Sequence, residues 1–319
     1  MLKRLESRKR KLLALGAIVG VLVLLPPIFP PYVVILMTQS LVYAIVAMSL
    51  DVLIGYTNLK SLGHGSFFAI GAYTSAILVT KLHVGFGVSL LSSMGMAAGA
   101  SALVGLLALR AAGIYFLLIT LAIAMCIWGL LYRWVSLTGG DNGIMDIPRP
   151  NLGLGLDLLD TVTFYYFILF FFVVCLILIL LLVRSPFGRT LVGIRDSESR
   201  MKVLGFNVWL HKYLALIIAG AFAGLAGNLY AYYNRFVGPG DSDLMQCMEF
   251  VLMVSIGGQG TLIGPNIGAF LITFLKNMVS VYTKRYLMIL AFVYILTAKY
   301  APEGIIGLLK RFQTRGKLA

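Results

Sequence analysis

The chain has 319 residues, of which 60% are hydrophobic and only 12% are charged. A soluble domain carries about a quarter charged residues, so this composition excludes an ordinary water-soluble enzyme, and the high hydrophobicity excludes disorder. The formal net charge is +14, and the basic residues cluster between apolar runs, which indicates membrane topology and not nucleic-acid binding. The sequence therefore predicts an all-α polytopic membrane protein.

A span needs about 20 apolar residues, and we expect about ten transmembrane segments. Their predicted ranges are 12–29, 32–54, 64–80, 86–109, 114–135, 162–183, 212–233, 244–257, 264–280 and 286–308. The first follows a basic start and lacks a small-residue cleavage site, so we interpret it as a retained helix and not as a signal peptide. The eighth is short and ends in Gly257-Gly258-Gln259-Gly260, which allows a half-helix that turns back.

Charge orients these segments. Residues 3–11, 184–212 and 299–319 hold six, six and five basic residues, and ten spans place all three on the cytoplasmic side. The acidic loops 138–161 and 234–243 then lie outside. We therefore predict a cytoplasmic basic N-terminus (1–11), a transmembrane domain (12–308) and a cytoplasmic basic tail (309–319).

Small residues recur at helix-packing spacing in Gly95-xxx-Gly99, Gly220-xxx-Gly224 and Gly264-xxx-Gly268, so we expect these faces to meet other helices. The stretches 61–73 and 255–270 resemble each other, and both enter a predicted span from a cytoplasmic turn. An internal repeat is one interpretation, and Gly-rich composition is the other.

No catalytic residue, metal site or bound cofactor is predicted. The chain has no phosphate-binding loop, so it should not hydrolyse ATP itself, and its three histidines lack metal-ligand spacing. Asp51, Arg110 and Arg133 are interpreted as helix-end residues that reach the membrane interface. Glu249 lies inside a segment and is a candidate for the translocation path.

The stretch 194–206 is predicted to be a short amphipathic helix on the cytoplasmic surface. Asp196 or Ser197 suits its start, Gly205 suits its end, and Glu198 and Lys202 are spaced for an ion pair. Its apolar face is formed by Ile194, Ser197, Met201 and Leu204. Spacing alone leaves three readings open: a helix on the lipid surface, a solvated linker, or a helix docked into a groove of a partner.

Several motifs in order resemble the LivM-type permeases of branched-chain amino-acid ABC importers. They are 55–58 with 61–73 (GYTN…SLGHGSFFAIGAY), 113–116 with 120–122, 137–144 (LTGGDNGI) with 147–150, 193–198 with 204–207, 212–215 with 219–231, and 257–265 (GGQGTLIGP). The resemblance covers about residues 32–310. Relatives usually carry small residues in the middle of the cytoplasmic helix, where this chain has Ser199, Arg200 and Met201.

The resemblance implies a type II ABC importer-like permease in the bacterial inner membrane. Its implied partners are a homologous second permease subunit, two ATPase subunits that bind ATP-Mg, and a periplasmic substrate-binding protein. The cytoplasmic helix would be the coupling helix, which contacts an ATPase. The implied contact residues are Ile194, Arg195, Asp196, Ser197, Glu198, Arg200, Met201, Leu204 and Gly205.

We expect the path to be lined at one turn by Asn58, Ser61 and His64, and at another by Gln259 and Thr261; the other reading is that these are polar turn residues satisfied locally. Alternatives to the amino-acid importer are a urea or short-amide importer permease, a stand-alone secondary carrier or channel that depends on Glu249 or an ion gradient, and a membrane-embedded enzyme. The missing catalytic cluster disfavours the last.

Overall fold

A computed structural model describes residues 20–150 and 158–282, together with a few single positions between 288 and 307. This part of the chain is helical apart from its connections and one isolated β-bridge. The helices are α2 (Pro31–Thr57), α3 (His64–Leu82), α4 (Phe86–Ala108), α5 (Ile114–Arg133), α6 (Val135–Thr138), α7 (Thr161–Arg184), α8 (Pro186–Asp196), α9 (Glu198–Val203), α10 (Val208–Asn234), α11 (Leu244–Gly257) and α12 (Ile263–Tyr282). Two 3₁₀ turns, η1 (Gly140–Asn142) and η2 (Pro239–Ser242), lie in the connections.

Six of the described helices are long and apolar enough to cross a membrane: α2, α3, α4, α5, α7 and α10. The ranges predicted from hydropathy agree with them to within a few residues. Helix α11 has 14 residues, as the short eighth segment predicts, and α12 has 20 but is not among the six. Residues 12–19 of the first predicted segment, most of the tenth, the N-terminus 1–11 and the tail 309–319 lie outside the described residues, so the predicted count of ten stays a prediction.

Local chemistry explains several helix ends. Pro31 begins α2, where its missing N–H is not needed. Asp160, Asn207 and Asp243 cap α7, α10 and α11, each accepting a backbone N–H with its side chain. Asn58 ends α2 in the left-handed conformation, with φ of 58°, which asparagine tolerates better than most residues.

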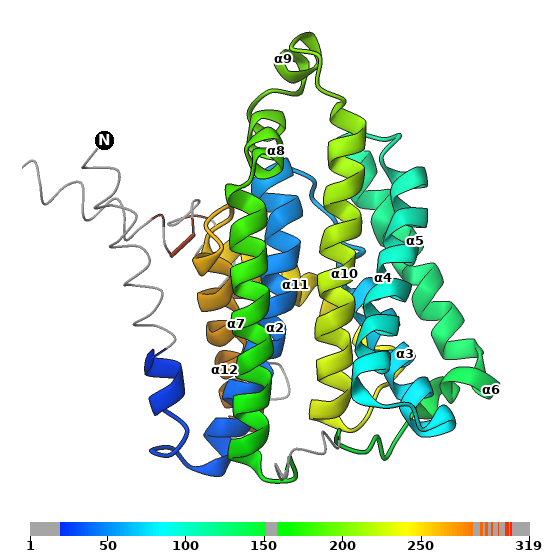
Figure 1. The fold of residues 1–319 in the computed structure, drawn as a ribbon, viewed down its shortest axis with the longest axis vertical. Coiled ribbons are helices and arrows are strands. Elements are labelled where there is room, and N and C mark those ends of the chain that lie inside the picture. Colours follow the sequence, from blue (N-terminus) through cyan, green and yellow to red (C-terminus); the bar gives the residue numbers. More distant parts are fainter. Residues whose placement is uncertain are drawn as a thin grey trace, which may run out of the picture.

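Helix α2 is the centre of the bundle: it packs against α7, α10, α11 and α12 (Figure 1). Helix α10 packs against α3 and α4 on the other side. Gly220 and Gly224 face Ser101, Ala97 and Ser93 of α4 at distances that leave no room for a Cβ. The small-residue face predicted for α10 is therefore confirmed.

The other two small-residue spacings have different outcomes. Gly268 lies against the backbone of Met253 in α11, so the α12 face also makes the expected close approach. Gly95 and Gly99 have no atom of the described chain within 4 Å of where a Cβ would be. The prediction of a helix contact there is wrong within the described chain, because this side of α4 faces outward.

The two acidic loops meet at one end of the bundle. Ile144 and Val237 exchange backbone hydrogen bonds of 2.9 and 3.0 Å, and Ile147 N donates to the carbonyl of Arg235. In Figure 1 this end lies at the bottom, and the connection from α7 through α8 and α9 to α10 lies at the top. The predicted placement of both acidic loops opposite the basic 184–212 stretch is therefore confirmed.

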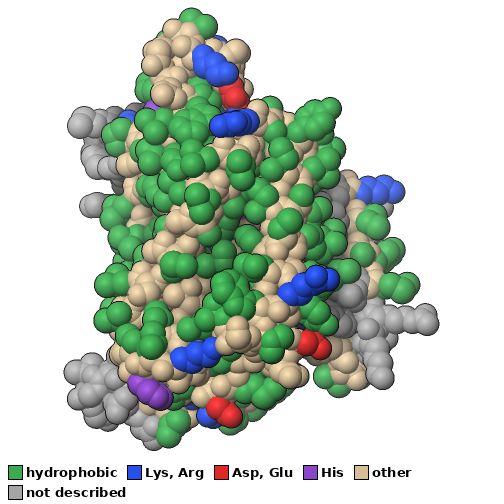
Figure 2. Space-filling view, turned by 90° about the vertical axis from the view of Figure 1, so that its right-hand side faces the viewer, with side chains coloured by type: hydrophobic (Ala, Val, Ile, Leu, Met, Phe, Trp, Pro, Cys, Tyr) green, Lys and Arg blue, Asp and Glu red, His purple; other side chains and the backbone are tan. Residues whose placement is uncertain are grey.

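The outer surface agrees with a lipid environment. Figure 2 shows hydrophobic side chains over the middle of one face, with charged side chains mostly toward its upper and lower ends. Exposed apolar residues of α4 and α5, such as Leu103, Leu107, Tyr115 and Leu118, contribute to this belt. Apolar side chains exposed at this depth are expected where the solvent is hydrocarbon.

Candidate coupling and translocation sites

The connection between α7 and α10, which is predicted to be cytoplasmic, is two helices and not one. The prediction of one continuous helix over 194–206 is wrong: α8 ends at Asp196, Ser197 is extended with φ of −165°, and α9 runs from Glu198 to Val203. Ser197 caps α9 by accepting the backbone N–H of Arg200, and Gly205 follows its end with φ of 84°. The predicted start and stop signals therefore hold for α9 alone.

A small apolar cluster holds the two helices together. Ile194, Met201 and Val208 pack on one another, and each is at most 9% exposed. A Cβ on Gly193 would lie 2.8 Å from the Met201 sulfur. The bulky methionine at this position therefore fills space inside the connection, and Ile194 and Met201 are not available to a partner.

Helices α8 and α9 form a projection from the bundle, and the tip of this projection is apolar. Val203, Leu204 and Phe206 are 88%, 69% and 41% exposed, and α9 stands at the far end from the bundle (Figure 1). Glu198 pairs with Lys212 of α10, which corrects the predicted pairing with Lys202. Lys212 thereby holds the start of α9 against the start of α10.

Arg195 is turned toward its own chain. Its Nη1 donates to the carbonyl of Gly55, near the end of α2, at 2.9 Å, and its Nη2 pairs with Asp196 at 3.1 Å. A Cβ on Gly260 would lie 3.2 Å from Arg195 Nη1. Arg195 therefore joins α8, the end of α2 and the turn between α11 and α12.

Asp51 binds the same turn from the other side. Its Oδ1 accepts from Gly260 N at 2.7 Å and its Oδ2 from Leu262 N at 3.3 Å, and the residue is fully buried. The interpretation of Asp51 as an interface-reaching residue is therefore wrong. A Cβ on Gly55 would lie 2.2 Å from both Asp51 Oδ1 and Gly260 N, so only glycine allows this close approach. Asp51, Gly55, Arg195 and Gly260 therefore lie in one contact between α2, α8 and the α11–α12 turn.

A pocket of about 200 Å³ brings the two predicted turns together. Ser61 and Gln259, two of the predicted path residues, both line it. The other lining residues are Ile54, Lys60, Leu62, Leu117, Val251 and Ser255. The pocket thus combines aliphatic walls with several polar groups and one cation, as a small-solute site requires.

The other three predicted turn residues do not line this pocket. Asn58 is exposed at the end of α2. Thr261 donates to Gly258 O and accepts from Gly264 N, so it closes its own turn. His64 is buried and lies 2.8 Å from Ser49 Oγ through Nε2. The predicted path residues therefore do not form one site.

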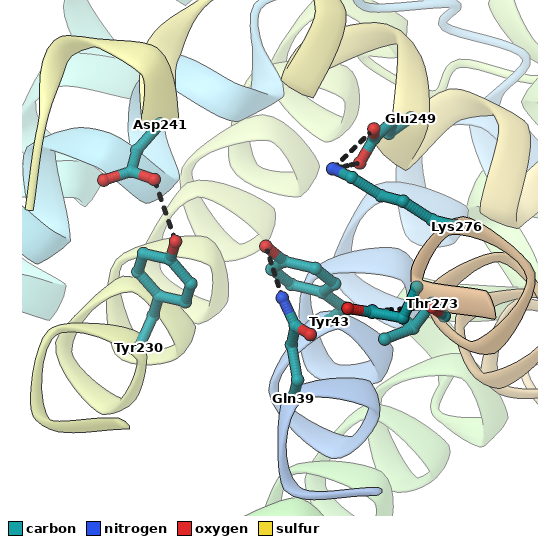
Figure 3. Close-up of polar contacts among 8 residues, drawn as sticks. Gln39, Tyr43, Tyr230, Asp241, Glu249, Thr273 and Lys276 are labelled. Atoms are coloured by element: carbon teal, nitrogen blue, oxygen red, sulfur yellow. Dashed lines mark hydrogen bonds and ion pairs between the residues drawn. The ribbon is translucent and has the colours of Figure 1, made fainter. Parts of the chain in front are cut away.

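Glu249, the last predicted path residue, lies in a second polar region (Figure 3). Its two carboxylate oxygens lie 2.7 and 2.9 Å from Lys276 Nζ of α12. Gln39 donates to Tyr43 OH at 3.4 Å, and Tyr230 OH donates to Asp241 Oδ1 at 3.0 Å. We call Gln39, Tyr43, Tyr230, Asp241, Glu249 and Lys276 the outer polar cluster. Of these, the sequence analysis assigned only Glu249 to the path, since a lone tyrosine or a loop aspartate gives no signal of convergence.

A bundle of long apolar helices with polar groups inside it and a helical projection at one end is typical of a membrane transport subunit. The chain belongs to the family described as the permease component of the branched-chain amino acid transport system, whose family model matches residues 32–298. It is a transport subunit of the ABC type and not an enzyme.

Curated relatives agree with this family. The chain is 30% identical to the high-affinity branched-chain amino acid transport system permease protein LivM of Escherichia coli, over 84% of this chain and 68% of that protein. It is 29% identical to the protein of the same name in Salmonella typhimurium, over 88% and 73%. It is also 26% identical to the probable branched-chain amino acid transport permease protein LivH of Methanocaldococcus jannaschii, over 79% and 84%. No solved structure matches the chain significantly.

Proposed function

We propose that the chain imports branched-chain amino acids across the bacterial inner membrane as one of two homologous permease subunits. Two ATPase subunits bind and hydrolyse ATP-Mg in trans, and a periplasmic binding protein delivers the substrate. The family and its relatives support the substrate class. Similarity to proteins called both LivM and LivH supports a related second permease. Both termini lie in the cytoplasm in this proposal.

The apolar tip of the cytoplasmic projection carries the proposal of ATPase coupling. Val203, Leu204 and Phe206 are exposed at the end of α9 and just after it, and α9 stands beyond the ends of the long helices (Figure 1). A helix lying on lipid would run along the ends of the spans, whereas α9 extends beyond them. Exposed apolar anchors on a short helix suit docking into a protein groove.

The polar face of α9 adds Arg200, which is exposed beside this tip. In this proposal the partner contacts Arg200, Val203, Leu204 and Phe206, while Ile194 and Met201 hold the projection together from within. Ser197 and Gly205 set the two ends of α9.

The test is Leu204→Asp in the tagged chain, co-expressed with its candidate partners. Burying a leucine contributes about 1.5–3 kcal/mol, so a charge there should lower ATPase binding by about tenfold or more. Co-purification from mild detergent and leucine uptake are the readouts. The matched control is Met145→Asp, since Met145 is similarly exposed, at 60%, in the connection at the opposite end of the helical bundle. Wild-type recovery of both ATPases with Leu204→Asp would refute the docking assignment.

Competing substrates and mechanisms are tested in the same vesicles. A urea or short-amide importer would show uptake inhibited by urea or acetamide and not by leucine. A secondary carrier would transport without ATPase subunits and would stop when the ion gradient is collapsed. The Glu249–Lys276 pair opposes a proton-coupled carrier, because protonating this carboxylate would first have to break an ion pair of 2.7 Å inside the bundle.

A further inference from the structure

The outer polar cluster gathers opposite charges from several elements in the outer half of the bundle (Figure 3). Glu249 lies five residues after the start of α11, about 8 Å along the helix axis. Lys276 lies six residues before the end of α12, at about 9 Å. Asp241 belongs to η2, the outer turn that precedes α11.

The ion pair is held away from water. The side chain of Glu249 is 5% exposed and that of Lys276 is 29% exposed. Removing two charges from water costs several kcal/mol each, and such a pair is often no more stabilising than apolar side chains of similar volume. An ion pair within the helical bundle of a membrane protein is therefore a candidate functional site before it is a stabilising device.

The arrangement of charges matches a zwitterion. An α-amino acid carries an ammonium and a carboxylate on neighbouring atoms. Its carboxylate can take the place of Glu249 beside Lys276, and its ammonium can take the place of Lys276 beside Glu249. One ion pair then becomes two, and the site stays neutral whether empty or occupied, so neither state leaves an unpaired charge in the bundle.

Neighbouring hydroxyl groups can orient a ligand at this site by hydrogen bonding. In the view of Figure 3 Tyr43 lies between Tyr230 and the ion pair, and Tyr230 brings a second phenol, which donates to Asp241. Thr273 lies three residues before Lys276 on α12, and its Oγ1 is buried with no hydrogen-bond partner among the described residues. These hydroxyls can donate to a carboxylate or accept from an ammonium.

An aromatic wall borders the cluster. The ring of Tyr43 lies 5.5 Å from that of Phe250, and the ring of Phe68 lies 5.3 Å from Phe250 and 5.1 Å from Tyr230. Aromatic rings beside a few polar groups suit a small ligand with one charged end and one aliphatic end.

From this geometry we infer that Glu249 and Lys276, with Tyr43, form an outer-half binding site for zwitterionic α-amino acids. The inference rests on the proposed function, because it places the imported substrate at this pair. The contrasting role is a structural link that only ties α11 to α12.

Two double variants separate the roles. Glu249→Gln with Lys276→Met removes both charges while roughly keeping side-chain volume, and Glu249→Lys with Lys276→Glu keeps an ion pair in reverse. Both are measured in the complete importer reconstituted in vesicles, with leucine uptake and ATPase co-purification as readouts. We expect both variants to retain the ATPases and to lose leucine uptake by about tenfold or more, because a single lost charge contact is worth about that factor. The reversed pair should fail because it places a carboxylate on α12 in place of the ammonium of Lys276. In the wild-type chain the positive charge of Lys276 acts favourably on the carboxylate of Asp241, and the reversed pair loses this attraction.

Wild-type uptake by either double variant would overturn the inference. The reversed pair keeps only a link between α11 and α12, and the uncharged pair removes even that, so uptake by either variant would show that the two charges do not bind the substrate. A second measurement covers variants that do not assemble. The change in Tm of the purified permease–ATPase complex is recorded with leucine, with 3-methylbutylamine, which lacks the carboxylate, and with 4-methylpentanoate, which lacks the ammonium. We expect only leucine to raise the Tm, and Lys276→Met alone to abolish this shift.

The matched control is Glu198→Gln with Lys212→Met, which removes the ion pair of the cytoplasmic projection by the same substitutions. It should keep the leucine-dependent Tm shift. Equal shifts with all three probes, or no shift in the wild-type complex, would overturn the binding site. A wild-type importer that moves no leucine at all would instead refute the proposed function.

Discussion

At the scale of single residues, the chain buries an ionisable side chain inside the bundle and provides hydrogen-bond donors for it. Asp51 is the clearest case, since its carboxylate is held by two backbone N–H groups and forms no ion pair within the described part of the chain. A carboxylate can accept at both oxygens, whereas a neutral amide has only one acceptor oxygen. The residue therefore fixes the position of the α11–α12 turn through its charge state and its geometry.

Asp51→Asn should destabilise the protein. One of the two backbone N–H groups, on Gly260 or Leu262, loses its acceptor and faces an amide N–H₂, which costs about 1–3 kcal/mol for a buried group. The Tm in mild detergent should fall accordingly. The control is Asp196→Asn, because Asp196 is 58% exposed at its side chain and its pairing with Arg195 is worth little. An unchanged Tm for Asp51→Asn would show that the turn is held by packing alone.

Asp241 predicts a pH dependence of stability. Burial raises the pKa of its carboxyl from the ordinary value to about 6, against the lowering effect of hydrogen bonds from Gly238 and Tyr230 and of the charge of Lys276. Between about pH 4 and pH 6 the folded protein holds a proton that the unfolded chain has released. The free energy of unfolding contributed by Asp241 therefore falls as pH rises through this window.

The measurement is the Tm of wild type minus that of Asp241→Asn, followed across the same window. This difference should decrease with rising pH and level off above the folded pKa. Asp160→Asn is the control: hydrogen bonds from Thr163 lower the pKa of the Asp160 carboxyl, so its contribution is lost only as pH falls below the window. A flat difference for Asp241→Asn would refute the raised pKa.

At the scale of elements, hydropathy predicts the spans well because each must bury or expose a long apolar surface. The predicted range 244–257 coincides with α11, and 162–183 differs from α7 by one residue at each end. The cytoplasmic connection was predicted less well, because Ile194 and Met201 keep helical spacing although Ser197 breaks the helix between them. Periodicity reports which residues share an apolar cluster, and it does not report whether the backbone between them is continuous.

The site was predicted only in part for a related reason. Ser61 and Gln259 line one pocket, as the two similar turns suggest, whereas Thr261 closes its own turn and the buried His64 contacts Ser49 of α2. Lys276, Asp241 and Tyr43 come from three elements whose meeting depends on how α2 and α12 pack. Pairing between distant segments has no local signature, so Glu249 was singled out without its partner.

The contact between α10 and α4 yields a third prediction. Asn228 Nδ2 donates to Ser89 Oγ at 2.8 Å and lies 3.3 Å from Ser93 Oγ, inside the bundle. Hydrogen bonds between membrane helices contribute about 0.6–2 kcal/mol, so Asn228→Ala should lower the Tm measurably. Thr80→Ala is the control, since its hydroxyl bonds only within α3. An equal effect of the two substitutions would mean that the interhelical bonds add nothing.

At the scale of the whole molecule, a continuous set of contacts joins the projection formed by α8 and α9 to the pocket that Ser61 and Gln259 line. Arg195, near the end of α8, donates to the carbonyl of Gly55 in α2. Four residues earlier, Asp51 holds Gly260, and the neighbouring Gln259 lines the pocket. If an ATPase docks on the projection as proposed, a displacement of α8 would act directly on the turn that forms the pocket wall, because closely packed elements move together or change partners.

Arg195→Ala should separate ATP hydrolysis from transport. The substitution removes the donor to Gly55 and leaves the apolar tip of α9 intact, so both ATPases should still co-purify and hydrolyse ATP. Leucine uptake per ATP hydrolysed should fall by about tenfold, the factor expected when one charge-assisted hydrogen bond of about 1.5 kcal/mol is lost from the moving state. Leu204→Asp should instead lose the ATPases themselves. Arg195→Lys, which keeps a cationic donor near Gly55, should recover part of the uptake. Wild-type uptake per ATP in Arg195→Ala would show that motion reaches the pocket by another contact, such as the Glu198–Lys212 pair between α9 and α10.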